Sequence, residues 1–240
     1  MIRPTFRNLD ESFEGWAYRS GLLRQVARLE RQGFLERRSK ENRIYRLTTA
    51  GRLRAIGGRD PKVQWRRPWD GYWRLICFDV PIADDLQRRR LRHYLRTRWF
   101  GLLQGSVWIT PDEVQEQNEL LQSTKVDVKS LVIFQARACA GESDRDIVVA
   151  GWDFDRINLA YRRHLRMLDE RPLHKVISPS GARALLNWAE AEHAAWTNTI
   201  AVDPLLPQVL LPRSYLGRQV WRRRVQALAA AYESIHAFKP

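Results

Sequence analysis

The order of elements predicted between residues 70 and 137 is the feature that most restricts the fold of this chain. Aromatic and branched residues in DGYWRLICFDVP predict a strand that ends near Asp79, and DDLQRRRLRHYLRTR predicts a helix with Asp84 or Asp85 near its start. FGLLQGSVWITP predicts a strand or strand pair, DEVQEQNELLQS a second helix and KSLVIFQAR a further strand. This alternation favours an α+β sandwich of ferredoxin type, with helices on one face of an antiparallel sheet.

A basic helix and a hairpin are predicted ahead of this segment. In SGLLRQVARLERQG, Ser20 is suited to cap the start of a helix and Gly33 to end it. At about 100° per residue the leucines and Val26 fall on one side, and the arginines and glutamines gather on the other. FLERRSKENRIYRLTTAG then predicts strands over 34–38 and 43–47 with a turn over 39–42. A helix followed by a basic hairpin is the order of a winged helix.

The C-terminal part is predicted to be helical. We interpret DRDIVVAGWDF as a candidate edge strand, followed by a helix through Leu159 and Leu168. Two more helices, SPSGARALLNWAEAEHAAW and RQVWRRRVQALAAAYESIHAF, flank the proline-rich loop DPLLPQVLLPRSYLG. The predicted domains are a winged helix over 1–58, a ferredoxin-like dimerisation domain over 69–170 and a helical domain over 171–240. The glycines and prolines around 59–68 predict a linker.

Positive charge is concentrated at the N-terminus. The formal net charge is +14, and residues 1–68 hold 17 Lys and Arg against 7 Asp and Glu, whereas residues 69–150 are nearly balanced. Arginine predominates, and its planar fork suits phosphates and base edges. We therefore expect the first segment to meet a polyanion. No apolar run approaches the ~18 residues of a membrane helix, and the start lacks a secretory signal pattern, so we expect a cytoplasmic protein.

Several of these segments resemble the PaaX family, the repressors of phenylacetate catabolism genes and their relatives. The resemblance is carried by LERQGFLERR…YRLTTAGR, WRLICFDVP, RRRLRHYLR, FGLLQGSVWITP and DPLLPQVLLPRSYLG, in this order over most of the chain. It implies a DNA-binding winged helix, a central domain similar to the small ferredoxin-like CRISPR-associated protein of spacer integration, and a helical C-terminal domain. It also implies a homodimer that releases DNA on binding an aryl-CoA thioester.

One feature departs from the winged-helix pattern. Two helices normally precede the recognition helix, but only 19 residues precede Ser20. We expect the first helix to be missing or abbreviated, which leaves open a misassigned start, a dimer contact in its place, or a dimer that has lost DNA binding.

The candidate DNA-binding residues lie on the helix and the hairpin. Helix residues would enter the major groove, where Arg and Gln read G and A edges, and hairpin residues would contact the backbone; a solvated charged face is the alternative. The helix candidates are Arg24, Gln25, Arg28 and Arg31. The hairpin candidates are Arg37, Arg38, Lys40, Arg43 and Arg46.

Asp79 is the candidate for an alternative function. The resemblance to the CRISPR-associated protein places an acidic residue at this strand end, where it has been linked to Mg²⁺-dependent nuclease activity. A single carboxylate does not make a metal site, which needs several oxygen ligands, and the five histidines show no ligand spacing. We therefore predict no cofactor, no metal and no enzyme activity, with a metal-dependent nuclease as the alternative.

Segments rich in tryptophan with nearby arginine are candidates for the effector site. They cover residues 99–108, 152–163 and 188–196, where indoles would stack an aryl group and arginines would hold phosphates. Ordinary aromatic core is the alternative for each tryptophan. The predicted function is thus a homodimeric DNA-binding repressor, bound to a double-stranded, roughly palindromic operator and released by an aryl-CoA or related acyl-CoA effector.

Overall fold

The computed structural model describes residues 22–38, 45–79, 85–114, 130–139, 141–172 and 176–237. The chain divides into two compact units. One comprises Met1–Asp60, His164–Ile200 and Trp221–Pro240, and the other comprises Pro61–Arg163 and Ala201–Val220. The C-terminal helices contribute residues to both units, so the units do not follow the linear order of the predicted domains, whose boundaries remain a prediction.

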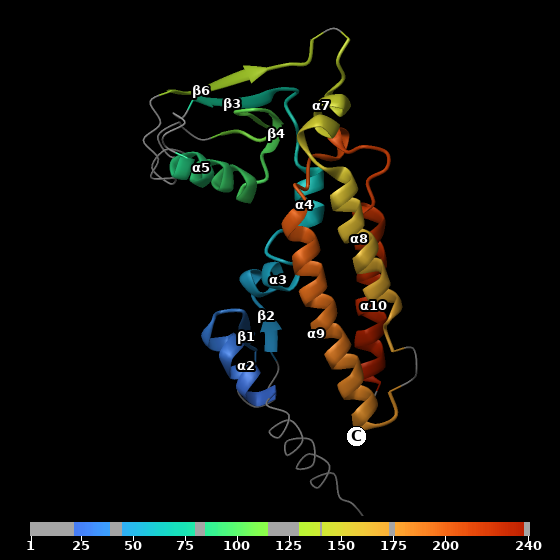
Figure 1. The fold of residues 1–240 in the computed structure, drawn as a ribbon. Helices are drawn as coiled ribbons and strands as arrows, with labels where there is room; N and C mark the ends of the chain where they lie inside the picture. The colour runs from blue at the N-terminus through green and yellow to red at the C-terminus, as the bar shows by residue number, and fades with distance from the viewer. Residues whose placement is uncertain are drawn as a thin grey trace, which may run out of the picture. The chain divides into compact units, whose positions relative to one another are not determined.

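The first unit contains the predicted helix and hairpin (Figure 1). Helix α2, Leu22–Arg31, is followed by strands β1, Leu35–Arg37, and β2, Tyr45–Leu47, which pair antiparallel with Leu35 opposite Leu47. As predicted, Gly33 follows the end of α2, and its φ of 73° is in the left-handed region that favours glycine. The Gly33 and Phe34 amides bond to the Glu30 and Leu29 carbonyls at 2.9 Å each. The predicted cap Ser20 and the turn over 39–42 lie outside the described residues.

A short helix that was not predicted follows the hairpin. Helix α3, Thr49–Ala55, begins at Thr48, whose hydroxyl accepts from the Gly51 amide at 3.0 Å and donates to the Gly33 carbonyl at 2.7 Å. A Cβ on Gly51 would lie 2.0 Å from the Phe34 carbonyl oxygen. Only glycine permits this close approach, which packs α3 against the turn between α2 and β1.

Three long helices complete the described chain. They are α8, Phe154–Asp169; α9, Pro179–Val202; and α10, Gly217–His236. All three occupy stretches predicted to be helical, and the proline-rich loop between α9 and α10 contains a short 3₁₀ helix, Gln208–Leu210. In the first unit Leu168, Leu185, Trp188 and Ala231 form one hydrophobic cluster. No helix among the described residues has the length and apolar character needed to cross a bilayer.

The second unit contains a four-stranded antiparallel sheet. Its strands are β3, Trp73–Asp79; β4, Gly101–Gln104; β5, Val107–Thr110; and β6, Ser130–Ala136, in the spatial order β4-β5-β3-β6. Helix α5, Asp85–Thr97, lies along one side of this sheet (Figure 1). This strand order is that of a ferredoxin-like domain, and the predicted α+β class is confirmed. The segment 115–129, which includes most of the second predicted helix, lies outside the described residues.

Alternation along the strands places the core between the sheet and α5. Residues two apart on a strand point to the same face, and Ile76 and Phe78 of β3 pack with Leu91 and Leu95 of α5 and with Trp108 of β5. These five side chains are at most 5% exposed.

Two segments differ from the prediction. Helix α4, Pro61–Arg66, lies within the stretch interpreted as a linker; Pro61 suits its first position, and Trp65 donates from Nε1 to the Tyr215 hydroxyl at 3.1 Å. The interpretation of DRDIVVAGWDF as an edge strand is wrong, because Asp144–Gly151 forms helix α7. Ser143 caps this helix and exchanges hydrogen bonds with Asp146 in a capping box, so the local signal for a helix start was present in the sequence.

Candidate nucleic-acid interface and ligand pocket

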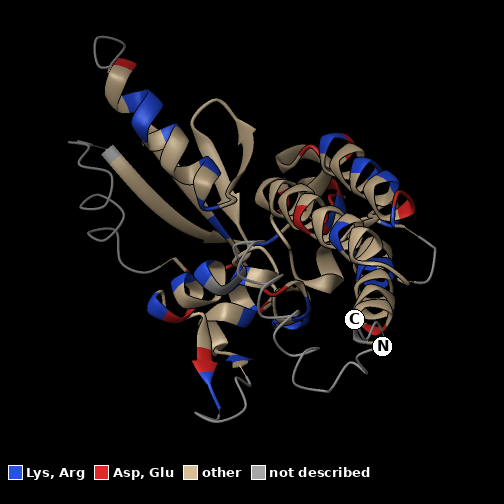
Figure 2. Ribbon diagram, turned by 90° about the horizontal axis from the view of Figure 1, so that it is seen from below, with Lys and Arg blue, Asp and Glu red and all other residues tan. Residues whose placement is uncertain are grey.

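The candidate recognition residues form an exposed face of α2. The side chains of Arg24, Gln25, Arg28 and Arg31 are all exposed, whereas Val26 is half-buried. No carboxylate of the described residues lies within ion-pair distance of the three arginines; Arg31 donates from Nε only to the Ala27 carbonyl, at 3.4 Å. The positive charge of this face is therefore not neutralised by described neighbours. Figure 2 marks the Lys and Arg positions of the described chain in blue.

The hairpin carries part of the predicted backbone-contacting set. Arg37 lies opposite Tyr45, and Arg46 lies opposite Glu36 in the antiparallel pair. The Arg46 Nε is 3.9 Å from the Glu36 carboxylate, so its charge is shared with an acidic neighbour. Arg38 is exposed just beyond β1. The predicted contacts Lys40 and Arg43 lie outside the described residues.

Two further arginines adjoin this surface. Arg52 and Arg54 are exposed on α3. Arg52 donates to the Leu47 carbonyl at 3.2 Å and to the Thr49 hydroxyl at 3.1 Å, which holds its side chain against the end of β2. The sequence interpretation missed α3, although Thr48 three residues ahead of Gly51 is a helix-start signal.

Among the described residues, no group of side chains joins Asp79 to form a metal site. It lies at the exposed end of β3, opposite Ser130 of β6. Asp84 lies outside the described residues, and Asp85 pairs with Arg89 at 2.9 Å. The described part of the chain contains no group of three or more His, Cys, Asp or Glu side chains arranged to hold a metal ion. The described residues around Asp79 thus offer no observation that favours the nuclease alternative.

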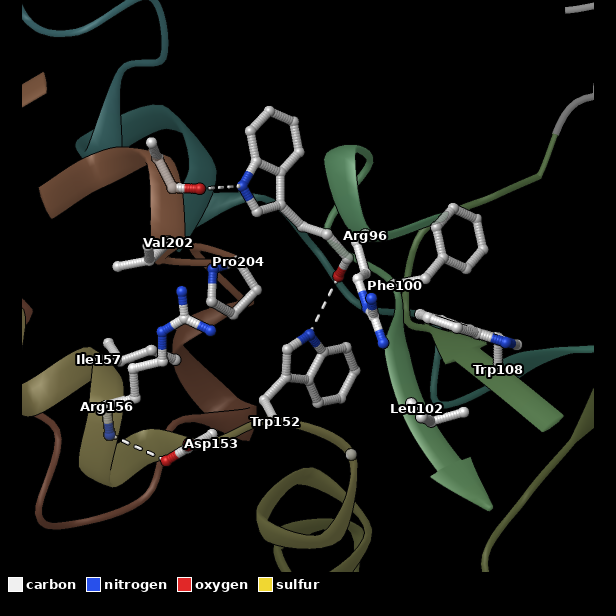
Figure 3. Close-up of a pocket in the computed structure, with 13 residues that line it drawn as sticks. Arg96, Phe100, Leu102, Trp108, Trp152, Asp153, Arg156, Ile157, Val202 and Pro204 are labelled. Carbon is white, nitrogen blue, oxygen red and sulfur yellow. Dashed lines mark hydrogen bonds between the residues drawn. The ribbon is translucent and has the colours of Figure 1, made fainter. Parts of the chain in front are cut away.

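A cavity of about 330 Å³ lies within the second unit (Figure 3). Its wall combines the end of α5, strands β4 and β5, the start of α8 and the end of α9. Aromatic side chains contribute much of the surface, and two arginines and one aspartate contribute charge. The lining residues used below are Arg96, Trp99, Phe100, Trp108, Trp152, Asp153, Arg156, Ala201, Val202 and Pro204.

Two tryptophans connect the walls of this cavity. Trp152 donates from Nε1 to the Trp99 carbonyl at 3.0 Å, and Trp99 donates from its own Nε1 to the Ala201 carbonyl at 3.1 Å, as Figure 3 shows. Trp99 has a φ of 61°, which is uncommon for a bulky residue and is maintained here by these hydrogen bonds. A Cβ on Gly101 would lie 2.8 Å from the Trp152 ring, so β4 approaches this indole closely.

A buried polar network supports the segment that follows α9. Asp203, which is 0% exposed, accepts from the hydroxyls of Tyr161 and Tyr215 and from the Leu205 amide at 2.8 Å. Burial, together with the charge of Asp203, holds the pKa of both tyrosines well above the usual range, so both hydroxyls remain protonated donors. Arg67 donates to the Leu205 carbonyl and forms two bonds to Asp112, at 2.6 and 2.9 Å. The hydrogen bonds of Asp203 and the bond from Arg67 to the Leu205 carbonyl therefore fix the backbone around Val202 and Pro204.

The cavity carries a net positive charge. Arg96 and Arg156 are exposed side chains, and no carboxylate of the described residues lies within ion-pair distance of either guanidinium. Arg96 stacks over the Trp108 ring at 5.9 Å from its centroid. Asp153 accepts a hydrogen bond from the backbone amide of Arg156 at 2.8 Å and so satisfies a backbone donor in the first turn of α8.

The cavity unites two of the three segments predicted for an effector. Trp99 and Trp108 come from the first and Trp152 from the second, whereas Trp188 and Trp196 of the third segment lie in the buried core of the other unit. There Trp188 donates to the Met167 carbonyl at 2.9 Å and Trp196 to the Ile56 carbonyl at 2.8 Å. The contribution of Ala201, Val202 and Pro204 was missed, because nothing local in the sequence relates this segment to Trp99.

A buried charged cluster in the first unit was also missed. Arg224 donates to both carboxylate oxygens of Glu192, at 2.7 and 3.2 Å, and to the Ala55 carbonyl at 3.4 Å. Its guanidinium lies 4.8 Å from the centroid of the Trp196 ring. His164 places Nε2 at 3.2 Å from the same carboxylate. Burial raises the pKa of Glu192, but the close contact with His164 and the hydrogen bonds from Arg224 outweigh it and leave the pKa below its usual value.

The fold and these surfaces define an α+β protein with a ferredoxin-like central sheet, an arginine-rich helix and hairpin ahead of it, and C-terminal helices. Residues 66–148 match the family model described as the PaaX protein central Cas2-like domain. Over these residues the chain is similar to the central domain of PaaX proteins, which confirms the predicted resemblance for this part of the chain.

Comparison with solved structures finds a similar fold. It belongs to the uncharacterized protein Rv0674 from Mycobacterium tuberculosis, with 22% identity, a TM-score of 0.56, and coverage of 91% of this chain and 83% of that one. At this identity the likeness concerns the fold alone. No protein with a curated description matches the chain.

Proposed function

We propose that this chain is a PaaX-type, DNA-binding transcriptional regulator that acts as a cytoplasmic homodimer and has no enzyme activity. The observation that carries the proposal is the exposed face of α2, where three arginines and Gln25 lie without a described carboxylate partner. In this proposal α2 is the recognition helix of a winged helix. An α-helix fits the major groove, and a bidentate Arg or Gln discriminates between bases by about 1–3 kcal/mol.

The hairpin adds contacts that position the protein. Arg37 and Arg38 lie on or beside β1 and would contact phosphates, which fixes orientation without reading sequence. Arg46 would contribute less, because Glu36 lies 3.9 Å from it. Two copies of the chain would match a roughly palindromic double-stranded operator by their two-fold symmetry.

The proposal also covers how the protein represses transcription and how an effector releases it from DNA. The regulator would block transcription when bound and leave DNA on binding an aryl-CoA or related acyl-CoA effector, as the family resemblance implies. An effector shifts such an equilibrium only by its preference for one of the two states.

The decisive experiment measures fluorescence anisotropy of the DNA fragment upstream of the protein's own gene, against a scrambled fragment, over a salt series. Specific regulators bind their sites at least about a thousandfold tighter than other DNA, and we expect such a preference here. Arg28→Ala should weaken specific binding by about 10-fold or more, whereas Arg183→Ala, an exposed arginine on α9, should leave it unchanged.

Equal binding to both fragments at physiological salt would contradict the proposal, because net charge alone gives affinity for any DNA that falls steeply with salt. An unchanged preference in Arg24→Ala and Arg28→Ala would likewise remove α2 from the role of recognition helix. Hydrolysis of DNA or RNA with Mg²⁺ that is lost in Asp79→Ala would replace the proposal with the nuclease alternative.

A further inference from the structure

We propose that Trp196 of α9 is a positioning residue, which holds α3 and with it the helix α2 in one orientation on the C-terminal helices. It does so through a hydrogen bond to the backbone at the end of α3, with Arg224 of α10 as a second donor. All of these contacts lie within the first unit. The consequence for DNA rests on the proposed function, in which α2 is the recognition helix.

Helix α2, the hairpin and α3 are joined closely enough to move together. The Thr48 amide donates to the Phe34 carbonyl at 3.0 Å, and the Thr48 hydroxyl donates to the Gly33 carbonyl at 2.7 Å. Gly51 of α3 lies so close to the Phe34 carbonyl that no side chain fits there. A rotation of α3 therefore carries α2 with it, because these contacts link the start of α3 to the turn that ends α2.

The end of α3 presents backbone carbonyls that need donors from elsewhere. The last carbonyls of a helix have no partner within that helix. Trp196 donates from Nε1 to the Ile56 carbonyl at 2.8 Å, and Arg224 donates from Nη2 to the Ala55 carbonyl at 3.4 Å. Arginine side chains are suited to such carbonyls. The end of α3 thus receives its donors from two other helices, and Figure 1 shows α3 beside α9.

The backbone just beyond α3 packs directly on α9. Gly57 has a φ of 88°, and a Cβ there would lie 2.7 Å from Ile200 Cγ2 and 3.5 Å from the Trp196 ring. The next residue, Gly58, has a similar φ of 83°, but a Cβ on it would meet no atom within 4 Å. The two glycines therefore share the same backbone conformation, while only Gly57 is required by the contact with α9.

The indole that makes this contact is itself fixed. Trp196 is 0% exposed, and its ring lies 4.8 Å from the Arg224 guanidinium. Arg224 is 3% exposed and is held by both carboxylate oxygens of Glu192, at 2.7 and 3.2 Å. Groups that are already ordered pay little further entropy to hold a partner. Trp196 therefore offers α3 a rigid support.

A distance measurement between spin labels tests the positioning without DNA. The labels are attached at Gln25→Cys on α2 and Ala194→Cys on α9, both of which are exposed positions. The background is the full chain with the native cysteines replaced, Cys77→Ala and Cys139→Ala. Dilution with unlabelled chain restricts the signal to distances within one chain. We expect a single narrow distribution of distances.

Two pairs of variants separate positioning from stability. Trp196→Phe removes the Nε1 donor but keeps a ring, and it should add a second or broader component to the distance distribution. Trp188→Phe is its control, because Trp188 is also buried on α9 but donates to the Met167 carbonyl at 2.9 Å, away from α3. Gly57→Ala should broaden the distribution as well, whereas Gly58→Ala should leave it unchanged. Circular dichroism and urea unfolding show that each variant is folded.

The same variants relate the orientation of α2 to DNA binding. Only the fraction of molecules in the competent orientation binds specifically, so losing one buried hydrogen bond in Trp196→Phe should weaken binding to the native upstream fragment about 5-fold or more. Binding to the scrambled fragment should change by less than about twofold, because it depends on charges that this variant keeps. Trp188→Phe should leave both affinities unchanged.

Unchanged distances in both Trp196→Phe and Gly57→Ala overturn the proposal. Equal broadening in Trp188→Phe overturns it too, because it would indicate a general loosening of the helices. Broadened distances with unaltered specific binding remove the consequence for DNA and overturn the positioning role. A chain without any preference for the native fragment would instead refute the proposed function, and the spin-label distances would still decide whether Trp196 positions α2.

Discussion

The buried pair of Glu192 and Arg224 leads to the sharpest stability prediction. The Glu192 side chain is 1% exposed and the Arg224 side chain 4%, and two hydrogen bonds of 2.7 and 3.2 Å join them. Arg224→Met keeps the bulk of the side chain but leaves the carboxylate with His164 as its remaining polar partner among the described residues. Removing one partner of a buried ion pair costs about 3–5 kcal/mol, a large part of the ~5–15 kcal/mol that stabilises a typical domain.

Urea unfolding measures this loss. Trp196 and Trp221 lie 4.8 and 5.7 Å from the Arg224 guanidinium, so the cluster contributes to the tryptophan fluorescence that follows unfolding, together with the other eight tryptophans. We expect the free energy of unfolding to fall by about 3–5 kcal/mol in Arg224→Met. The double variant Arg224→Met, Glu192→Leu should recover most of it, because replacing a whole buried pair with apolar residues is often neutral.

Arg223→Met is the matched control. Arg223 is the neighbouring residue of α10 and pairs with Asp169 at 2.5 Å, but its side chain is 48% exposed. Surface pairs contribute about 0–1 kcal/mol, so a small loss is expected. Equal losses of unfolding free energy in Arg224→Met and Arg223→Met would refute the argument from burial. A double variant of Arg224 and Glu192 that is as unstable as the sum of its two single changes would refute it as well.

Three further predictions follow from the described contacts. Because the pKa of Glu192 is held below its usual value, the stability that its charged carboxylate gives the fold is complete at neutral pH and is lost as pH falls through about 4 and below. Urea titrations should therefore show a steeper loss of unfolding free energy in acid for the native chain than for Glu192→Gln, and equal slopes would contradict this. Gly51→Ala places a Cβ 2.0 Å from the Phe34 carbonyl oxygen and should cost about 1–3 kcal/mol in thermal or urea unfolding, whereas Gly181→Ala, whose nearest atom is at 3.5 Å, should not destabilise. Ser143→Ala removes the cap of α7 and should cost about 0.5–2 kcal/mol, with an unchanged midpoint counting against the cap.

Local patterns were sufficient for most of the elements. The apolar repeats of α2, α5, α8, α9 and α10, and the alternation of β3, are set by which face of each element is removed from water, and this periodicity is readable along the chain. The ferredoxin-like order followed from the succession of these elements. The helix α7 was the exception, because the short apolar run IVVA suits a strand as well as a buried helix; its capping residues, Ser143 and Asp146, decided the outcome.

The chemistry of the interior depended on tertiary structure. Glu192 and Arg224 are charged residues on two different helices, and periodicity alone would place them in water; only the packing of α9 against α10 and α8 brings them together with His164. The cavity likewise joins Trp99, Trp152 and Ala201, which are separated by about 50 residues at each step. The sequence by itself determined the elements and the basic N-terminal surface, since these depend on neighbours a few residues apart. The tertiary structure decided which distant side chains share a pocket or a buried charge, because such contacts depend on how whole elements pack.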